Sequence, residues 1–197
     1  SVNLKKVRAL APTHVIVNVD ENKKETADAL AEFVPNLIVT HPLGPLDNLA
    51  LYRQIGSAFG KQREAEDLCA RFEMIYESIV KESSRKKSVL YLIWKDPWMT
   101  VSRDTYVSRT LALFGLQTFP EHAEERYPKI SLEESWLQQV EIVLLSSEPY
   151  RFQEKHLEEI AFTLKKPARL IDGEMASWYG SRAIPGLRYL ADFSASV

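Results

Sequence analysis

The strongest constraint on the fold is a series of short apolar runs, rich in β-branched residues, that recur along the chain. Three of them each follow a proline: "THVIVN" after Pro12, "NLIVT" after Pro35 and "ARLID" after Pro167. The segments "SVLYLIW" and "VEIVLLSS" have the same character. Short runs of this kind are typical of strands that are buried on both faces of a parallel sheet.

Helical patterns fill the intervals between these runs. We expect helices at 22–33, 46–59, 103–115, 152–164 and 184–193. Strands that alternate with helices predict βα units and an α/β fold with mostly parallel sheets.

A longer helix is predicted from Lys61 to about Lys81. Its apolar positions repeat at i, i+3, i+4 and i+7, and they are Ala65, Leu68, Cys69, Phe72, Ile75, Tyr76, Ile79 and Val80. About twenty helical residues span roughly 30 Å, which is the width of a small domain. We therefore expect two lobes joined by a long rigid helix. The alternative is one continuous sheet with a long crossover helix.

The predicted domains are an N-terminal lobe at 1–60, a connecting helix and linker at 61–87 and a C-terminal lobe at 88–197. The first lobe has only two convincing strands, which make a thin core. We therefore expect it to be partial, and its exposed apolar surface to favour self-association.

Composition excludes several classes of protein. The 197 residues are 45% hydrophobic, enough for a packed core, and 25 basic against 27 acidic residues offer no field for nucleic acid. No apolar run approaches the roughly 18 to 20 residues of a membrane helix. Cys69 is the only cysteine, which excludes an internal disulfide. Its place on an apolar helix stripe predicts a buried structural thiol.

Familiar catalytic patterns are missing from the sequence. It has no glycine-rich phosphate loop, no G-x-S-x-G and no H-E-x-x-H, and its four histidines are scattered. His14 opens a strand and His156 is expected on an exposed helix face. We assign no catalytic residue and no metal ligand, and we take the turn "HPLGP" at 41–45 as a candidate cleft wall.

Three of the four tryptophans follow predicted strands. Trp94 and Trp98 follow "VLYLI", and Trp178 with Tyr179 follows "ARLID". Loops from the carboxyl ends of neighbouring strands meet at one edge of a sheet, so we expect a hydrophobic slot for a large planar ligand. Arg182 would pair with a ligand carboxylate or lie against a ring. The alternative is that these rings fill space beneath loops, which is what we expect of Trp136.

Acidic residues also follow strands. Asp20, Glu21 and Glu25 come after the first strand, where we expect them to cap the next helix. Glu148 and Glu174 follow later strands, so acids stand at the rim of any cleft. A docking surface for a basic partner is the other interpretation of these acids.

The order of these elements resembles a known family. "VRALAPTHVIVNVDENKKETADAL", "VPNLIVTHP", "DNLALYRQIGSAFGKQREAEDLCARFE", "VLYLIWKDPWMTVSRDTYVSRTLALFG" and "LIDGEMASWYGSRAIPGLRYL" together resemble the helical-backbone periplasmic substrate-binding proteins of ABC importers. These proteins bind cobalamin, haem or ferric siderophores, and the resemblance is closest to the cobalamin-binding branch. It covers nearly the whole chain.

The resemblance implies a bilobed fold that binds its ligand between the lobes, without catalysis and without an intrinsic cofactor. It assigns Trp94, Trp98, Trp178, Tyr179 and, more weakly, Arg182 to ligand binding. One glutamate per lobe would dock on the membrane permease, with Glu25 and Glu174 as the candidates. Family members normally begin with an earlier strand, and this chain starts after that point.

The leading hypothesis is the binding component of an importer for a corrinoid or another large metal chelate, such as haem or a ferric siderophore. Its expected location is periplasmic, or extracytoplasmic with a membrane anchor. A second hypothesis is a cytosolic α/β enzyme that uses Asp96, Asp104 or Glu174 as general acid or base. A third is a family member that acts as a sensor or interaction protein.

Overall fold

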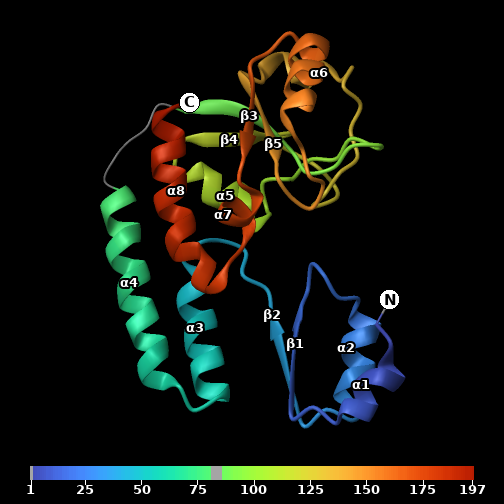
Figure 1. Ribbon diagram of the computed structural model, residues 1–197, viewed down its shortest axis with the longest axis vertical. Helices are drawn as coiled ribbons and strands as arrows, with labels where there is room; N and C mark the ends of the chain where they lie inside the picture. Colours follow the sequence, from blue (N-terminus) through green and yellow to red (C-terminus); the bar gives the residue numbers. More distant parts are fainter. Residues whose placement is uncertain (1, 81–85) are drawn as a thin grey trace. The chain divides into compact units, whose positions relative to one another are not determined.

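The computed structural model describes residues 2–80 and 86–197, and Figure 1 labels its α-helices and most of its strands. The chain forms two compact units, Ser1–Pro42 and Leu43–Val197. Parallel strands alternate with helices in both, so the predicted α/β class is confirmed. In the described part of the chain, no helix combines the length and the apolar composition needed to cross a membrane.

The first unit is a two-stranded parallel sheet covered by two helices. Its core holds Val17, Leu30 and Val34, while Ile16 and Val39 are 52% and 48% exposed. The predicted self-association depends on such exposed apolar side chains and stays a prediction. The elements are α1 (Leu4–Leu10), β1 (His14–Asn18), α2 (Lys24–Ala31) and β2 (Asn36–Thr40).

The second unit is built on a four-stranded parallel sheet with the order β4-β3-β5-β6. Its helices and strands are α3 (Asp47–Ala58), α4 (Gln62–Val80), β3 (Lys87–Leu92), α5 (Tyr106–Ala112), β4 (Leu116–Phe119), β5 (Ile142–Ser146), α6 (Glu154–Leu164), β6 (Ala168–Ile171), α7 (Gly173–Ser177) and α8 (Ala183–Ala195). Two short 3-10 helices, η1 (Ser135–Gln139) and η2 (Gly180–Arg182), complete it.

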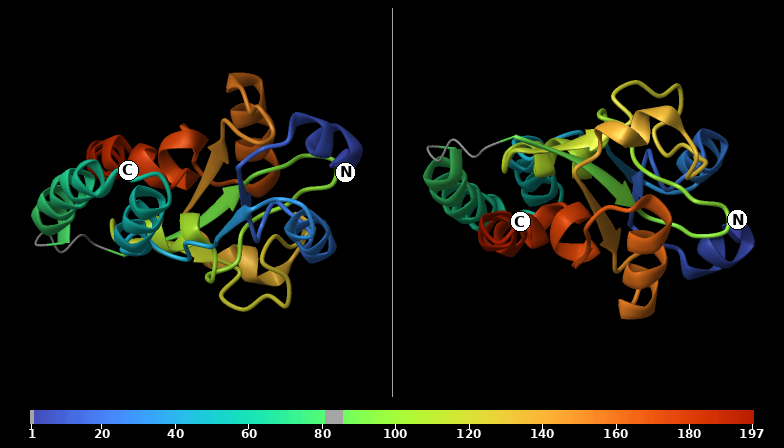
Figure 2. Two further views of the ribbon diagram at one scale, coloured as in Figure 1. Left: turned by 90° about the horizontal axis from the view of Figure 1, so that it is seen from below. Right: turned by 90° about the horizontal axis from the view of Figure 1, so that it is seen from above.

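Both faces of this sheet are buried, because residues along each central strand point alternately to two cores. Val89 and Tyr91 of β3 belong to one core, with Phe72 of α4 and Leu187 of α8. Leu90 and Leu92 belong to the other, with Ile160 of α6. Figure 2 shows α3, α4 and α8 grouped on one side of the sheet. The unbroken apolar runs of the sequence are thus explained by burial on two sides.

The long helix predicted at 61–81 is confirmed as α4, and Cys69 on it is buried as expected. Burial raises the pKa of the Cys69 thiol, which keeps it protonated and unreactive at neutral pH.

The first compact unit ends at Pro42, whereas the predicted boundary of the first lobe was at residue 60. Tyr52 of α3 packs edge-on against Phe72 of α4, with ring centroids 6.3 Å apart, and the Cys69 thiol donates to the carbonyl of Leu49. These contacts place α3 in the second unit, and the chain divides after Pro42. Part of the predicted linker, at 81–85, lies outside the described residues.

Candidate functional site

The candidate site is the carboxyl edge of the four-stranded sheet, where all four parallel strands end. Loops at 93–105, 120–134, 147–153 and 172–182 leave the carboxyl ends of β3, β4, β5 and β6. Neighbouring strands lie about 4.8 Å apart, so this edge extends roughly 14 Å from β4 to β6. Loops at this edge are where parallel α/β sheets bind ligands.

The loop after β3 carries Trp94 and Trp98, and the structure gives them different surroundings. Trp94 is 39% exposed and meets Tyr150 edge-on, with ring centroids 5.7 Å apart. Trp98 is half-buried and stacks on Phe152 at 6.2 Å, with planes 3° apart. Trp98 thus packs on the α6 side of the sheet, and Trp94 is the ring that this loop offers to solvent.

Trp178, beyond β6, is 46% exposed and yet firmly held. Its indole Nε1 donates to Oε1 of Glu148 at 2.6 Å, and the same oxygen accepts from the Ser177 hydroxyl at 2.9 Å. The guanidinium carbon of Arg182 lies 5.7 Å from the centre of the indole ring. Glu148 thus engages the edge of the indole and Arg182 its face, so the fold itself holds this ring.

Arg182 and Glu174 were predicted to act separately, one on a ligand and the other on a permease. In the structure they pair with each other, with Arg182 Nη2 2.9 Å from Glu174 Oε2. Both side chains stay about 40% exposed (41% and 42%), so the pair remains at the surface. The arginine is therefore partly neutralised where the prediction had it free for a carboxylate.

Helix α3 holds the segment 172–182, which carries Trp178 and Tyr179, at Gly180. The buried Asn48 accepts from the Gly180 N–H at 2.7 Å and donates to the Tyr106 hydroxyl at 2.9 Å. Tyr52 donates to the Gly180 carbonyl at 2.8 Å. Burial raises the pKa of Tyr106 to about 12, so its hydroxyl stays protonated. Tyr179 lies edge-on to Tyr106 at 5.8 Å, which joins it to this buried network.

Two glycines explain why the stretch from Gly173 to Arg182 has its composition. A Cβ on Gly173 would lie 2.4 Å from the Ser146 hydroxyl and 2.5 Å from Cγ of Glu148, so only glycine allows this close approach. Gly180 has φ +71°, a conformation that favours glycine. One glycine brings the loop against Glu148, and the other turns it so that Asn48 can hold it.

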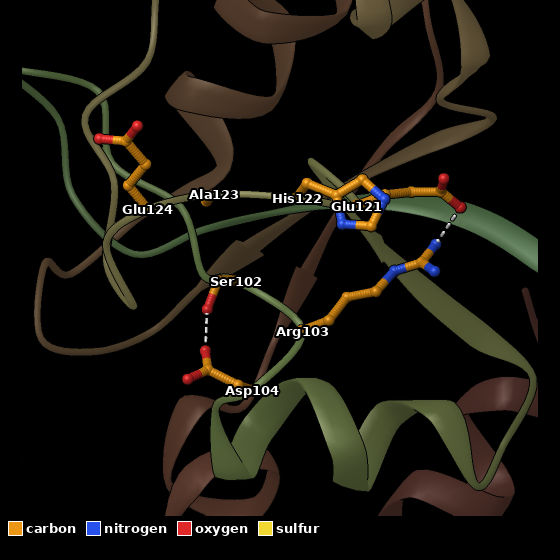
Figure 3. Close-up of a pocket in the computed structure, with 7 residues that line it drawn as sticks. All are labelled: Ser102, Arg103, Asp104, Glu121, His122, Ala123 and Glu124. Carbon is orange, nitrogen blue, oxygen red and sulfur yellow. Dashed lines mark hydrogen bonds and ion pairs between the residues drawn. The ribbon is translucent and has the colours of Figure 1, made fainter.

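A hollow of about 400 Å³ lies at the β3 and β4 end of the same edge, and Figure 3 shows its lining. Arg103 donates to the carbonyl of Thr118 at 3.2 Å and pairs with Glu121 at 2.8 Å. Ser102 donates to Asp104. Acidic groups dominate the lining, which consists of Ser102, Arg103, Asp104, Glu121, His122, Ala123 and Glu124. Of these residues, only Asp104 was predicted from the sequence as a candidate for chemistry. The lining residues lie in loops, which have no periodic pattern of apolar residues.

Comparison with known families decides the classification. The model of a family described as periplasmic binding protein matches residues 1–175. The chain belongs to this family. The family that the sequence resemblance predicted is thereby confirmed.

Solved structures share the fold of this periplasmic binding protein at low sequence identity. The vitamin B12 binding protein BtuF of Vibrio cholerae is 13% identical, with a TM-score of 0.79 and coverage of 100% of this chain and 79% of that one. The heme-binding protein RhuT of Roseiflexus sp. RS-1 is 19% identical, with a TM-score of 0.78 and the same coverage. The heme-binding protein HutB of Vibrio cholerae is 17% identical, with a TM-score of 0.75 and coverage of 98% and 80%.

At these identities the likenesses establish the fold alone. A search of curated proteins finds no match to the sequence.

The remaining predicted residues of this binding protein have varied outcomes. Glu25 is exposed in the first turn of α2, where an acid is favourable, and the residue that precedes this helix, Lys23, makes no capping bond with its side chain. Capping of α2 by Asp20 and Glu21 stays a prediction, and Asp20 lies 3.5 Å from His41. The loop at 41–45 is held in part by Asp47, which accepts from the Leu43 and Gly44 N–H groups at 2.8 and 2.9 Å.

The expected exposure of His156 is also wrong. It is 5% exposed, and its Nδ1 accepts from the Gln153 N–H at 2.9 Å at the start of α6. Phe152 and Tyr150 surround its ring, which explains the burial. Trp136 packs against the core on the α6 side, as predicted. Among residues 2–80 and 86–197, the structure contains no cluster of three or more histidine, cysteine or acidic side chains suited to a metal ion.

Proposed function

We propose that this protein is the substrate-binding component of an ABC importer and captures a corrinoid or a related metal chelate, such as haem or a ferric siderophore. Membership of the periplasmic binding protein family supports a binding role without catalysis. The fold is shared with BtuF, which binds vitamin B12, and with RhuT and HutB, which bind heme. Its location would be periplasmic or otherwise extracytoplasmic.

The observation that carries the proposal is the exposed but fixed ring of Trp178 at the ligand edge of the sheet. A flat macrocycle gains stacking and apolar burial from such a ring at little ordering cost. Trp94, also exposed, and Tyr179 extend the aromatic surface, and Arg182 supplies a cation beside Trp178. Trp98 contributes by supporting the loop that carries Trp94.

Spectral titration with cyanocobalamin, haemin and a ferric siderophore tests the proposal. We expect saturable binding of at least one of them, weakened roughly tenfold or more by Trp178→Ala, since one aromatic contact contributes about 1 to 3 kcal/mol. Trp136→Phe is the matched control, because Trp136 lies in η1, just before the amino end of β5, and packs against the core. If none of the three binds to the full-length protein, or if Trp178→Ala binds like the parent, the proposal is wrong.

Delivery to a permease is part of the same proposal. Glu25 and Glu174 are the proposed docking acids, and the ion pair with Arg182 predicts that Glu174 docks less freely than Glu25. Glu25→Lys and Glu174→Lys are expected to lower uptake of the ligand in cells. Glu25→Lys should leave the dissociation constant of the ligand within about twofold, whereas Glu174→Lys also removes the ion pair of Arg182 beside Trp178. Uptake unchanged in both variants would contradict these assignments.

A further inference from the structure

Glu148 is the residue that fixes the plane of the exposed Trp178 ring. It follows β5, and its Oε1 accepts the indole N–H at 2.6 Å. A hydrogen bond to a carboxylate is shorter and stronger than one between neutral groups, so it holds the ring against rotation. The Glu148 carboxylate accepts from the Trp178 indole and from the Ser177 hydroxyl through the same oxygen.

The backbone around Trp178 does not need this bond. The Trp178 N–H donates to the carbonyl of Glu174 at 3.0 Å, and the single hydroxyl hydrogen of Ser177 is shared between the Gly173 carbonyl at 2.7 Å and Glu148 at 2.9 Å. On the other side, Asn48 and Tyr52 hold Gly180. Since the loop is anchored before and after Trp178 by other contacts, the bond to Glu148 acts mainly on the orientation of the ring.

The packing around Glu148 supports the same role. Gly173 lies so close to Cγ of Glu148 that a methyl group there would approach it to 2.5 Å. The side chain of Glu148 is thus confined between Gly173 and the indole, while Trp178 itself is 46% exposed. A confined acceptor at the edge of an exposed ring is an arrangement that orients the ring for a partner outside the protein.

We infer that Glu148 is a positioning residue for ligand binding: its carboxylate holds the Trp178 ring in the plane against which a flat ligand stacks. The inference rests on the proposed function and assigns Glu148 no direct contact with the ligand. Without the bond, the indole regains rotamer freedom that binding must remove again, which weakens binding roughly 3- to 10-fold.

A double-mutant cycle tests the inference, with cyanocobalamin and haemin as probes. The variants are Glu148→Ala, Trp178→Phe and both together, because phenylalanine keeps an aromatic ring but has no N–H. We expect Glu148→Ala to weaken binding 3- to 10-fold in the parent and by less than twofold in the Trp178→Phe background. Glu148→Gln retains an acceptor oxygen and is expected to recover most of the affinity.

Glu158→Ala on the exposed side of α6 is the matched control for removal of a carboxylate, and it should bind like the parent. Proton–nitrogen NMR provides a readout without ligand: the indole N–H signal that disappears in Trp178→Phe should shift and exchange faster in Glu148→Ala. Glu148→Met, which keeps the length of the side chain but has no carboxylate or amide oxygen, serves the same measurements if the alanine variant does not fold.

The outcomes separate the two proposals. If Trp178→Phe and Trp178→Ala both bind like the parent, the proposed site itself is wrong. If Trp178→Ala weakens binding but Glu148→Ala does not, or weakens it equally in both backgrounds, the positioning role of Glu148 is overturned and the proposed function stands.

Discussion

Replacing Asn48 with alanine removes three side-chain hydrogen bonds from the interior of the second unit. Its amide donates to the Pro45 carbonyl at 2.8 Å and to the Tyr106 hydroxyl at 2.9 Å, and its oxygen accepts from the Gly180 N–H at 2.7 Å. The residue is 0% exposed, so water cannot replace these bonds without rearrangement. At about 1 kcal/mol net for each bond, we expect a loss of about 3 kcal/mol.

A loss of this size lowers the melting temperature of a domain of about 150 residues by roughly 6 to 12 °C. Urea unfolding followed by circular dichroism measures the free energy directly, and a thermal melt checks it. Ser57→Ala, at an exposed position on the same helix, is the matched control and should change stability by less than about 0.5 kcal/mol.

The affinity of Asn48→Ala for the ligand is a second measurement. Because Asn48 holds Gly180, its loss should loosen the loop that carries Trp178 and weaken ligand binding as well. A loss of less than about 1 kcal/mol in Asn48→Ala would refute the reasoning, because it would mean that the buried network does not support the loop.

Three further predictions follow from the same geometry. Gly173→Ala should cost about 1 to 3 kcal/mol by overpacking and should shift the Trp178 indole signal in NMR, since the new methyl group would collide with Glu148; an unshifted signal would contradict the close approach. Burial raises the pKa of Tyr106 to about 12, so the unfolded chain ionises first and stability should fall as pH rises from about 10 to about 12, which ultraviolet difference titration and urea unfolding can follow. Equal tyrosine titration in folded and unfolded chains would refute this. The acidic hollow should disfavour the carboxylates of haem relative to the amides of a corrinoid. Glu124→Gln is therefore expected to improve haemin binding roughly 2- to 5-fold at low salt and to leave the affinity for cyanocobalamin unchanged. Equal effects on both ligands would exclude the charge argument.

The features that the sequence predicted correctly are those that depend on local patterns. Unbroken apolar runs located five of the six strands, and the repeat of apolar residues from Ala65 to Val80 located α4. β4 was missed because its residues, LQTF, contain no unbroken apolar run, and α7 because its five residues are too few for a helical period to show. The carboxyl-edge position of Trp94 and Trp178 followed from strand direction alone.

What the sequence could not show depends on contacts between distant residues. Stacking of Trp98 on Phe152 and the hold of Asn48 on Gly180 join segments that no pattern connects. The same holds for the boundary after Pro42, since it is decided by α3 packing against α4. The pairing of Arg182 with Glu174 couples two residues for which the sequence predicted independent roles.

The stretch from Gly173 to Arg182 illustrates how these two kinds of information combine in one site. Its glycines serve different purposes, because Gly173 permits a close approach to Glu148 and Gly180 permits a turn that Asn48 can hold. Trp178 lies between them, so its position is set by both anchors within a single folded unit. A ring that is placed by the fold itself has little freedom left to lose on stacking, and affinity at this edge should therefore depend on the anchors as much as on the ring.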